Sequence, residues 1–427
     1  MKTYIVQIVL LCLPGFIGAQ QRNLDFYIRQ AKASSPLINQ ANNNNKIVGL
    51  DLEQIRNILT KPEINVEASA LLAPIIAHDN NRNRFQLVSN GANSYSGYDM
   101  ALTDGGQYQS VISLRQPLFT GSRFGAYSEM ADISRQINEN RITLTAHELE
   151  RIISQQYLLC LKAKRTAETN RQLLLVLGEQ MDLMQKLVEN AVYTQSDLML
   201  LQIEYDNFKL NYESAQSDYL TNLFDLNLLS GIKDTVIVDL EEIKPQIKNP
   251  PVTASEFVNS YRLDSLGIIA EQNISNLKYK PQLNFFVNAG MNAVYLPAFN
   301  RFGFSTGLTL GWNIFDGYQR KLLKQKTEIT LQTIDFEKQH FITQKEINEN
   351  AILKQIDLVE KRKVLADSQL NEYDKLLKVY RAKLAQGEIS VIDYKTIFRD
   401  LAEKKQERAL LDLEEKALII SYNYWNY

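Results

Sequence analysis

Two similar short sequences, far apart in the chain, constrain the fold more than any other feature. They are Leu114–Gly121 and Leu310–Gly317, and each one ends an alternating stretch and opens a long polar stretch without proline. The two copies lie 196 residues apart (317 − 121 = 196). Thr194 and Ser390, which begin a second pair of similar sequences, keep the same offset (390 − 194 = 196). A fixed offset between two pairs predicts a tandem structural repeat with helical segments of equal length.

The first residues have the layout of a secretory signal. Lys2 precedes an apolar run over 5–13, and small residues lead up to Ala19. This order predicts a signal peptide over 1–19 that is removed on export, with a buried first helix as the alternative. No later stretch reaches about 18 consecutive apolar residues, so we expect no transmembrane helix beyond this point.

Charge and chemistry-bearing residues argue against several classes of function. The formal net charge is −2, so the chain has no basic surplus to neutralise nucleic-acid phosphates. His78, His147 and His340 are scattered, and Cys160 is the single cysteine outside the predicted signal. No nucleotide-binding loop and no catalytic constellation stands out. We therefore expect neither an enzyme nor a bound cofactor or metal, and no intramolecular disulfide.

The second half of the sequence contains two strongly alternating stretches. Over 283–293 and 304–314, apolar side chains alternate mainly with asparagine, serine, threonine and glycine. Each stretch has the length of about 9–11 residues that a tilted strand needs to cross a bilayer. The solvated face of a soluble sandwich is usually charged, whereas neither stretch contains lysine or glutamate. The pattern favours membrane-spanning strands, with a soluble sandwich as the alternative.

The first half predicts a matching pair of strands, one beginning at Ile64 and the other ending at Leu118. The sequence between them is rich in asparagine and glycine, and we expect a long surface loop over 73–106. The two Lys-Pro pairs that precede the strand pairs lie 219 residues apart (280 − 61 = 219). This is 23 more than the offset of the glycines (219 − 196 = 23), and a surface loop absorbs extra length at little cost.

Long helices follow each pair of strands. From Arg123 to about Asn190 the sequence predicts a helix of about 68 residues, or roughly 100 Å. Near its end, apolar residues recur at heptad spacing, and the same spacing returns 196 residues later, which predicts coiled-coil packing. The two seams are Leu174, Leu177, Met181, Met184, Val188 and Ala191, and then Leu370, Tyr373, Leu377, Tyr380, Leu384 and Gly387. Shorter helices are predicted over 36–60, 196–230 and 391–427.

These elements divide the chain into four parts. After the signal, the first repeat covers 20–230, with its strand hairpin at about 62–119. A connector follows over 231–251, where an alternation at Val236 and Val238 is compatible with a short strand. The second repeat covers 252–427, with its hairpin at about 281–315. Four strands per chain cannot close a barrel, for which about eight is the practical minimum, so a barrel requires several copies.

Four motifs at matched spacing resemble those of TolC-type outer-membrane efflux and secretion channels. Two are strand-to-helix elements and two are helix tips. They read QPLFTGSR (Gln116–Arg123), WNIFDGYQR (Trp312–Arg320), AVYTQSDL (Ala191–Leu198) and GEISVIDY (Gly387–Tyr394). The resemblance implies a mixed fold, in which a membrane β-barrel of twelve strands from a homotrimer (3 × 4 = 12) continues into an α-helical coiled-coil barrel. It also implies a place in the outer membrane of a Gram-negative cell, in contact with lipid, with an extended periplasmic portion.

The same resemblance implies a passive exit duct of a tripartite efflux or type I secretion system. An inner-membrane pump or ABC transporter would supply the energy, and a periplasmic adaptor (membrane fusion protein) would dock on the helix tips. The docking residues are then Ala191, Val192, Tyr193, Thr194, Gly387, Glu388, Ile389 and Ser390. The strand-to-helix turns are assigned to Pro117, Gly121, Asn313 and Gly317. The sequence names neither the exported substrate nor the class of partner transporter.

The starts of the two returning helices have two interpretations. A hydroxyl followed three residues later by an acid has the spacing of a capping box, which places helix caps at Thr194, Asp197, Ser390 and Asp393. The resemblance gives Asp393 a second role, in a ring of carboxylates across a closed entrance. The sequence departs from the family pattern at Thr396, where a second acid is expected, and at Ile389, where an arginine is expected. A gate and a simple helix cap both stay open.

A second class of function is also compatible with the residues. An exported coiled-coil scaffold or adhesin could contain the same long helices, with the alternating strands forming a soluble β-sandwich. Extraction separates the two hypotheses, because a membrane barrel leaves the cell envelope only with detergent, whereas a scaffold is recovered from the soluble fraction.

Overall fold

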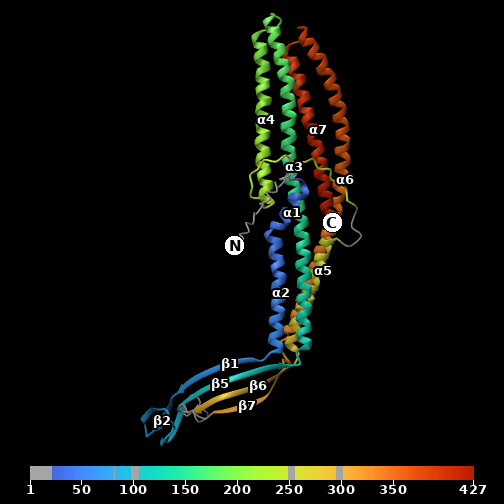
Figure 1. The fold of residues 1–427 in the computed structure, drawn as a ribbon. Helices are drawn as coiled ribbons and strands as arrows, with labels where there is room; N and C mark the ends of the chain where they lie inside the picture. Colours follow the sequence, from blue (N-terminus) through green and yellow to red (C-terminus); the bar gives the residue numbers. More distant parts are fainter. Residues whose placement is uncertain (1–21, 81, 98–104, 249–254, 295–301) are drawn as a thin grey trace, which may run out of the picture. The chain divides into compact units, whose positions relative to one another are not determined.

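The computed structural model describes residues 22–80, 82–97, 105–248, 255–294 and 302–427 (Figure 1). The predicted signal peptide lies outside these residues. The chain divides into two compact units, and each is described by itself. The first unit combines the residues up to Asn39 with Thr143–Glu256 and Phe341–Tyr427, and the second combines Gln40–Ile142 with Phe257–His340.

The helices repeat in length as the sequence offset predicts. Two are long, with 69 residues in α3 and 67 in α6, and two shorter ones, α4 and α7, have 35 residues each. The helix that precedes the first strand begins at Pro36, where the amide of Ile38 donates to Oγ of Ser35 at 3.4 Å. The bounds are α1 (Leu24–Ser34), α2 (Pro36–Thr60), α3 (Gly121–Glu189), α4 (Gln195–Leu229), α5 (Glu256–Asn276), the 3₁₀ turn η1 (Leu277–Tyr279), α6 (Gln319–Ala385) and α7 (Val391–Trp425).

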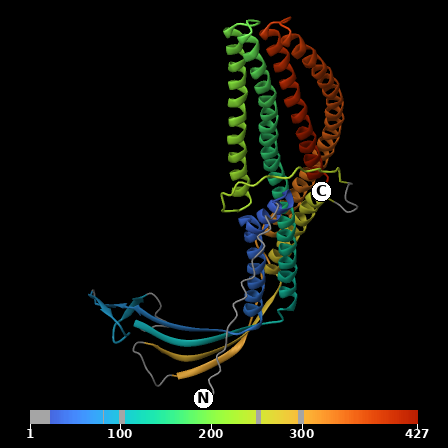
Figure 2. The ribbon, with the colours of Figure 1, turned by 45° about the horizontal axis from the view of Figure 1, so that its top comes forward.

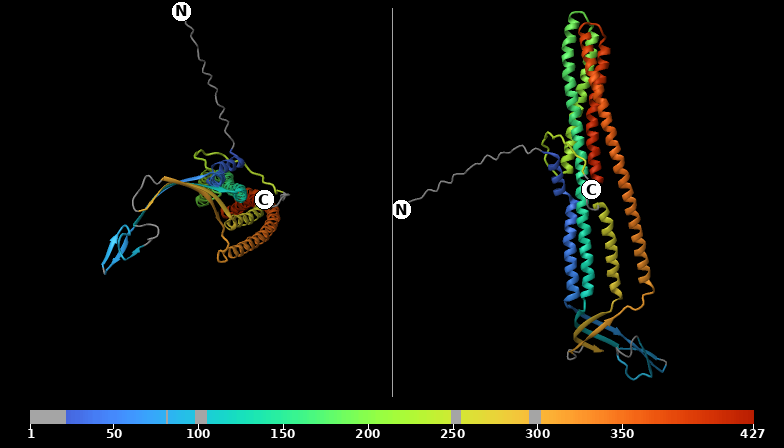
Figure 3. Two further views of the ribbon diagram at one scale, coloured as in Figure 1. Left: turned by 90° about the horizontal axis from the view of Figure 1, so that it is seen from below. Right: turned by 90° about the vertical axis from the view of Figure 1, so that its right-hand side faces the viewer.

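In the first unit, α3, α4, α6 and α7 run side by side (Figure 3). Near their ends they enclose a buried apolar cluster that contains part of the predicted heptad seams. Leu177, Met184 and Leu384 are fully buried there, and Tyr394 and Phe398 of α7 pack against them. Residues at heptad spacing on two helices therefore meet, as coiled-coil packing requires.

No strand forms in the described part of the connector that follows α4, so the alternation at Val236 and Val238 does not produce the short strand with which it is compatible. Residues 232–248 have no regular secondary structure. Side chains of the neighbouring helices satisfy the carbonyl groups of the connector in place of a partner strand, as where the Tyr219 hydroxyl donates to the Val238 carbonyl at 2.6 Å. Leu240 is fully buried in a cluster with apolar residues of α1, α3 and α4, which fixes the segment against the helices.

In the second unit, four long strands form one antiparallel sheet in the order β1-β5-β6-β7 (Figure 2). Their bounds are β1 (Glu63–Ala73), β5 (Gly105–Leu118), β6 (Gln282–Val294) and β7 (Phe302–Gly311). Because β5 pairs with β6, the strands of the two repeats belong to a single sheet. Within the described chain, β1 pairs only with β5 and β7 only with β6, so the outer edge of each is unpaired.

The prediction of a long loop over 73–106 is wrong for much of the part of this range that the structure describes. A second, smaller antiparallel sheet occupies this region in the order β3-β2-β4. Its strands are β2 (Ile75–Asp79), β3 (Arg82–Gln86) and β4 (Ser94–Gly97). Ile75 is buried, and the ring nitrogens of His78 lie 2.8 Å from Oδ1 of Asn83 and 2.8 Å from Oγ of Ser96 on the two neighbouring strands. Polar side chains that indicate a loop in the sequence here link strands to one another.

The last strand, β7, ends at Gly311, three residues before the predicted end at Ile314. Its partner β6 begins at Gln282, which pairs with Gly311, so no strand is available to pair with the residues that follow. The indole of Trp312 instead donates to the carbonyl of Tyr279 at 3.2 Å.

Candidate functional site

The two helix tips, in the first unit, have the same backbone turn. At the first tip, the amide of Ala191 donates to the carbonyl of Val188 at 3.0 Å, and the amide of Val192 donates to that of Leu187 at 2.9 Å. The residues 196 positions later make the same two bonds, at 3.1 and 3.0 Å. These are the bonds of a Schellman motif, which ends a helix with a residue in the left-handed conformation.

The residue in the left-handed conformation differs between the tips. It is Ala191 at the first tip, with φ of +59°, and Gly387 at the second, with φ of +75°. A Cβ atom on Gly387 would lie only 2.9 Å from Cγ1 of Val192 in the other tip. Glycine at the second tip thus avoids both the left-handed strain and the close contact between the tips, whereas alanine at the first tip holds a strained conformation.

A tyrosine hydroxyl joins the two tips. The hydroxyl of Tyr193 lies 2.7 Å from the carbonyl oxygen of Ile389 and 3.1 Å from that of Leu384, and it donates to these two backbone groups of the second tip. Burial, and then the nearby carboxylate of Asp197, raise the pKa of Tyr193 above its ordinary value, so the hydroxyl keeps its proton. Within the sequence repeat, Tyr193 corresponds to Ile389 (389 − 193 = 196), so the first tip alone supplies this bond.

Both hydroxyl residues at the predicted caps bond to the first turn of the helix that follows. Oγ1 of Thr194 accepts from the amide of Asp197 at 3.3 Å, and the Asp197 carboxylate accepts from the amide of Thr194 at 3.0 Å, which completes a capping box. At the second tip, Oγ of Ser390 accepts from the amide of Asp393 at 3.1 Å and donates to its carboxylate at 2.7 Å. Asp393 is solvent-exposed at the start of α7.

An ion cluster around a buried glutamate near the tips was missed by sequence reasoning. Glu204 of α4 is only 2% exposed, and its carboxylate bonds to Nη2 of Arg399 at 2.8 Å and lies 3.6 Å from Nζ of Lys395, both on α7. The sequence does contain a signal that Glu204 is buried. Leu201 lies three residues before it and Phe208 four residues after it, so all three belong to the same helix face, and Leu201 and Phe208 are buried. The cluster ties the returning helices of the two repeats together.

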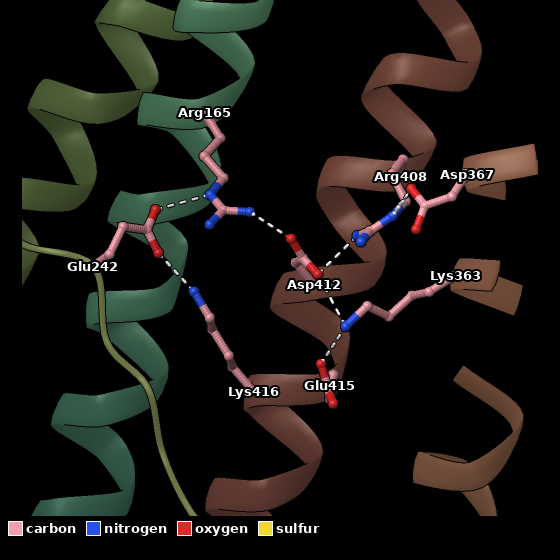
Figure 4. A network of polar contacts seen from close by, with 8 residues as sticks. All are labelled: Arg165, Glu242, Lys363, Asp367, Arg408, Asp412, Glu415 and Lys416. Atoms are coloured by element: carbon pink, nitrogen blue, oxygen red, sulfur yellow. Dashed lines mark hydrogen bonds and ion pairs between the residues drawn. The ribbon is translucent and has the colours of Figure 1, made fainter. Parts of the chain in front are cut away.

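A network of charged side chains links α3, the connector, α6 and α7 (Figure 4). At its centre, the carboxylate of Asp412 lies 2.7 Å from Nη1 of Arg408, 3.1 Å from Nζ of Lys363 and 3.2 Å from Nη1 of Arg165. Burial acts to raise the pKa of Asp412, but the bonds from these three cations outweigh burial and lower the pKa to about 2. The carboxylate therefore stays ionised at neutral pH and cross-links three helices.

In the second unit, the register of the sheet aligns side chains of one kind in two neighbouring rows that cross all four strands. The polar row consists of Asn65, Ser113, Asn288 and Ser305. The row next to it consists of Val66, Ile112, Ala289 and Phe304, all apolar. Paired residues point to the same side of an antiparallel sheet and neighbours in a strand to opposite sides, so the two rows lie on opposite sides of the sheet, which we call its polar and its apolar side. In the single chain, Val66 is 71% and Phe304 79% exposed on the apolar side.

The strand-to-helix junctions place the four predicted turn residues in different settings. Pro117 lies within β5, Gly121 is the first residue of α3, Asn313 lies between β7 and α6, and Gly317 is left-handed with φ of +66°. At the first junction the left-handed residue is Phe119, with φ of +54° and 87% exposure. Sequence reasoning missed it because bulky residues rarely adopt this conformation.

The described residues include no group of histidine, cysteine, aspartate or glutamate placed to hold a metal ion. In the same ranges, no helix is both long and apolar enough to cross a bilayer. His147 is a packing residue, since its ring stacks on that of Tyr427 with centroids 3.7 Å apart.

Neither a protein-family model nor a curated protein sequence matches the chain. Solved structures do match it over most of its length. The outer membrane channel CmeC of Campylobacter jejuni is 11% identical, with a TM-score of 0.68 and 94% of this chain aligned to 85% of that one. The MtrE outer membrane channel of Neisseria gonorrhoeae, in its open state, is 14% identical with a TM-score of 0.68, over 94% of this chain and 88% of that one. The outer membrane protein VceC of Vibrio cholerae is 13% identical with a TM-score of 0.67, over 94% and 96%. The chain therefore has the fold of the TolC-type outer-membrane channels.

Proposed function

We propose that three copies of this chain form an exit duct in the outer membrane, through which an inner-membrane transporter exports solutes. The duct itself is passive, and the energy comes from the transporter. The fold supports this proposal, because similar structures include outer membrane channels.

The alternating rows of the sheet are the observation that carries the proposal. A strand that crosses a membrane as part of a barrel alternates apolar side chains toward lipid with polar side chains toward the lumen. The row through Ala289 is apolar on every strand, and the row through its neighbour Asn288 is polar on every strand. In a soluble sandwich the apolar side would be covered by another layer, whereas Val66 and Phe304 are exposed here.

The unpaired edges of the sheet support the number of copies. An open edge presents backbone N–H and C=O groups without hydrogen-bond partners. Inside a bilayer each such group costs a free energy on the order of several kcal/mol. Pairing β1 of one copy with β7 of the next would remove every edge. Four strands per chain and three copies give twelve strands, which exceeds the practical minimum of about eight.

The two helix tips are the docking surface in this proposal. A periplasmic adaptor would insert its own helical hairpins against the residues of the tips, from Ala191 to Thr194 and from Gly387 to Ser390. The first tip exposes small and apolar side chains, including Val192, so a helix can pack there without burying a charge, whereas the second tip also exposes the carboxylate of Glu388. The bond from Tyr193 to the second tip would keep the two halves of this surface in register.

Asp393 is a candidate entrance residue within the same proposal. Three copies of Asp393 around one axis would repel one another and attract cations, so the purified channel should be mostly closed, and the current through its entrance should favour cations. Single-channel recordings in planar bilayers would test this on Asp393→Ala, with Asp197→Ala as the matched cap variant from the first tip. If both variants keep the selectivity of the wild type in intact trimers, Asp393 is a helix cap alone.

The sharpest test of the proposal compares two neighbours in one strand. Ala289→Arg should block outer-membrane insertion, since arginine on the lipid side costs about 2–4 kcal/mol near the bilayer midplane. Asn288→Arg adds the same charge on the polar side and should insert normally. Equal recovery of both variants in detergent-extracted outer membranes would contradict the assignment of sides. Recovery of the wild type as a soluble periplasmic protein would favour the scaffold or adhesin instead.

A further inference from the structure

A hollow lies where the sheet of the second unit meets its helices. One cavity of about 650 Å³ is bounded by α3, η1 and the first turns of α6. A second cavity of about 290 Å³ lies beside it, between the end of α2 and the strands β5 and β6. Arg123, Tyr127 and Gln282 line both, so the two cavities adjoin at a shared wall. We call the two together the junction hollow.

The junction hollow includes residues from the polar side of the sheet. Glu63 lies two residues from Asn65 in β1, and Arg115 lies two residues from Ser113 in β5, so both belong to the side of the polar row. The register pairs Glu63 directly with Arg115. The hollow is therefore reached from the side that would face the lumen of a barrel.

The charges that line the hollow are mostly positive. The ionisable lining residues other than Tyr127 and Tyr279 are Glu63, Arg115, Arg123, Lys278 and Lys326. The guanidinium of Arg123 is held by a hydrogen bond to a backbone carbonyl at 2.9 Å. No carboxylate lies within 4.0 Å of the ammonium group of Lys278 or Lys326 in the described part of the chain. The nearby carboxylate of Asp316 already accepts bonds from the Tyr279 hydroxyl and a backbone amide of α6.

We propose that the junction hollow binds phosphate and carboxylate groups of solutes on their way through the channel. This inference rests on the proposed function, in which the polar side of the sheet lines the duct. Three copies would then place a ring of cationic side chains around the axis, which is how pores select anions. Arginine and lysine form charge-assisted hydrogen bonds to phosphate and carboxylate oxygens, and the Tyr127 hydroxyl is a further donor. The exported substrates are accordingly solutes that contain an anionic group.

Two pairs of substitutions on the purified full-length protein test the site. Lys278→Gln with Lys326→Gln removes two cations of the hollow. Lys321→Gln with Lys324→Gln removes two cations from α6 outside the lining, because Lys321 and Lys324 lie on the opposite helix face from Lys326. Isothermal titration calorimetry in detergent measures the affinity for pyrophosphate, with sucrose as the uncharged probe. Planar-bilayer recording then measures block of the current by pyrophosphate.

We expect pyrophosphate to bind the wild type and to block its current, and sucrose to do neither. The double variant Lys278→Gln with Lys326→Gln should weaken binding and block by about tenfold or more, because it loses two hydrogen bonds to a charged ligand. The double variant Lys321→Gln with Lys324→Gln should weaken them by less than about twofold. Absence of binding, or equal loss in both pairs, would overturn the site. Binding without block, or displacement of pyrophosphate by phosphatidylglycerol in micelles, would overturn the assignment to passing solutes. A wild type that binds pyrophosphate but forms no channel would overturn the proposed function while the site itself stands.

Discussion

The two helix tips share the hydrogen bonds of their turns but differ in the residue that takes the left-handed conformation. The first tip places Ala191 there and the second places Gly387. A side chain at the second position would force Val192 of the first tip to shift, because a Cβ atom on Gly387 would lie 2.9 Å from Cγ1 of Val192. The first tip also supplies Tyr193, whose hydroxyl bonds to the second tip.

This difference shows how a duplicated element specialises without losing its backbone. In the first copy, Ala191 adopts the left-handed conformation, which costs about 1–2 kcal/mol for a residue with a side chain. In the second copy, Gly387 avoids this cost and leaves room for Val192. The contacts that join the tips run from the first to the second, through Val192 and Tyr193. Substitutions at equivalent positions should therefore have different and sometimes opposite effects.

The largest effect is expected for Ala191→Arg. This substitution exchanges one side chain for another at the same left-handed position, so it adds little backbone strain while placing a charge on the proposed docking surface. We expect export in cells to be abolished while the trimer stays intact, measured by substrate efflux and by the mass of the extracted particle. Ala191→Ser is the matched control and should export normally. Normal export by Ala191→Arg would contradict docking at the tips.

Gly387→Ala should destabilise the tips by about 1–2 kcal/mol, since alanine is disfavoured at this φ, with a further cost from the clash with Val192. Hydrogen exchange of the backbone amides in the turns measures the change. The double substitution with Val192→Ala should recover the part that comes from the clash. If Val192→Ala recovers none of the loss caused by Gly387→Ala, the contact between the tips is not formed in solution.

Tyr193→Phe removes the hydroxyl that joins the tips and should destabilise them by about 1 kcal/mol, the net value of a typical hydrogen bond. Hydrogen exchange of the backbone amides in the second tip measures this change, because the carbonyl groups that lose the hydrogen bond from Tyr193 belong to that tip. Tyr205→Phe is the matched control, since Tyr205 packs in the same cluster and its hydroxyl makes no hydrogen bond within the described residues. Equal effects of the two variants would mean that the bond from Tyr193 contributes nothing specific.

The smallest effect is expected for Ala191→Gly, and it has the opposite sign to Gly387→Ala. Glycine relieves the left-handed strain but gives the unfolded chain more freedom, so the net gain should be below about 1 kcal/mol. Slower exchange in the first turn is the expected result. Faster exchange would mean that Ala191 makes a contact that outweighs its strain.

The sequence predicts the helical part of this fold well because long stretches without proline, together with heptad spacing, depend only on local periodicity. The predicted helix over 36–60 coincides with α2, and the equal lengths of α4 and α7 follow from the offset of the repeat. The alternation in β6 likewise predicts which side chains share a face.

Features that depend on contacts between distant residues could not be predicted. The pairing of β5 with β6 and the bond from Tyr193 to Ile389 join segments far apart in the chain. The small sheet around His78 was missed because strands of 4 or 5 residues are too short to show a period, and their polar side chains are typical of loops. The ion pairs of Glu204 were missed because its nearest partner, Arg399, lies 195 residues away on α7.

The mass of the particle that detergent extracts from outer membranes tests the central claim most directly. The unpaired edges of β1 and β7 require further copies of the chain to close a barrel, and three copies satisfy this with twelve strands. Native mass spectrometry of the wild type should give the mass of three mature chains, with no stable monomer. A monomer recovered without detergent, from the soluble periplasmic fraction, would contradict the account.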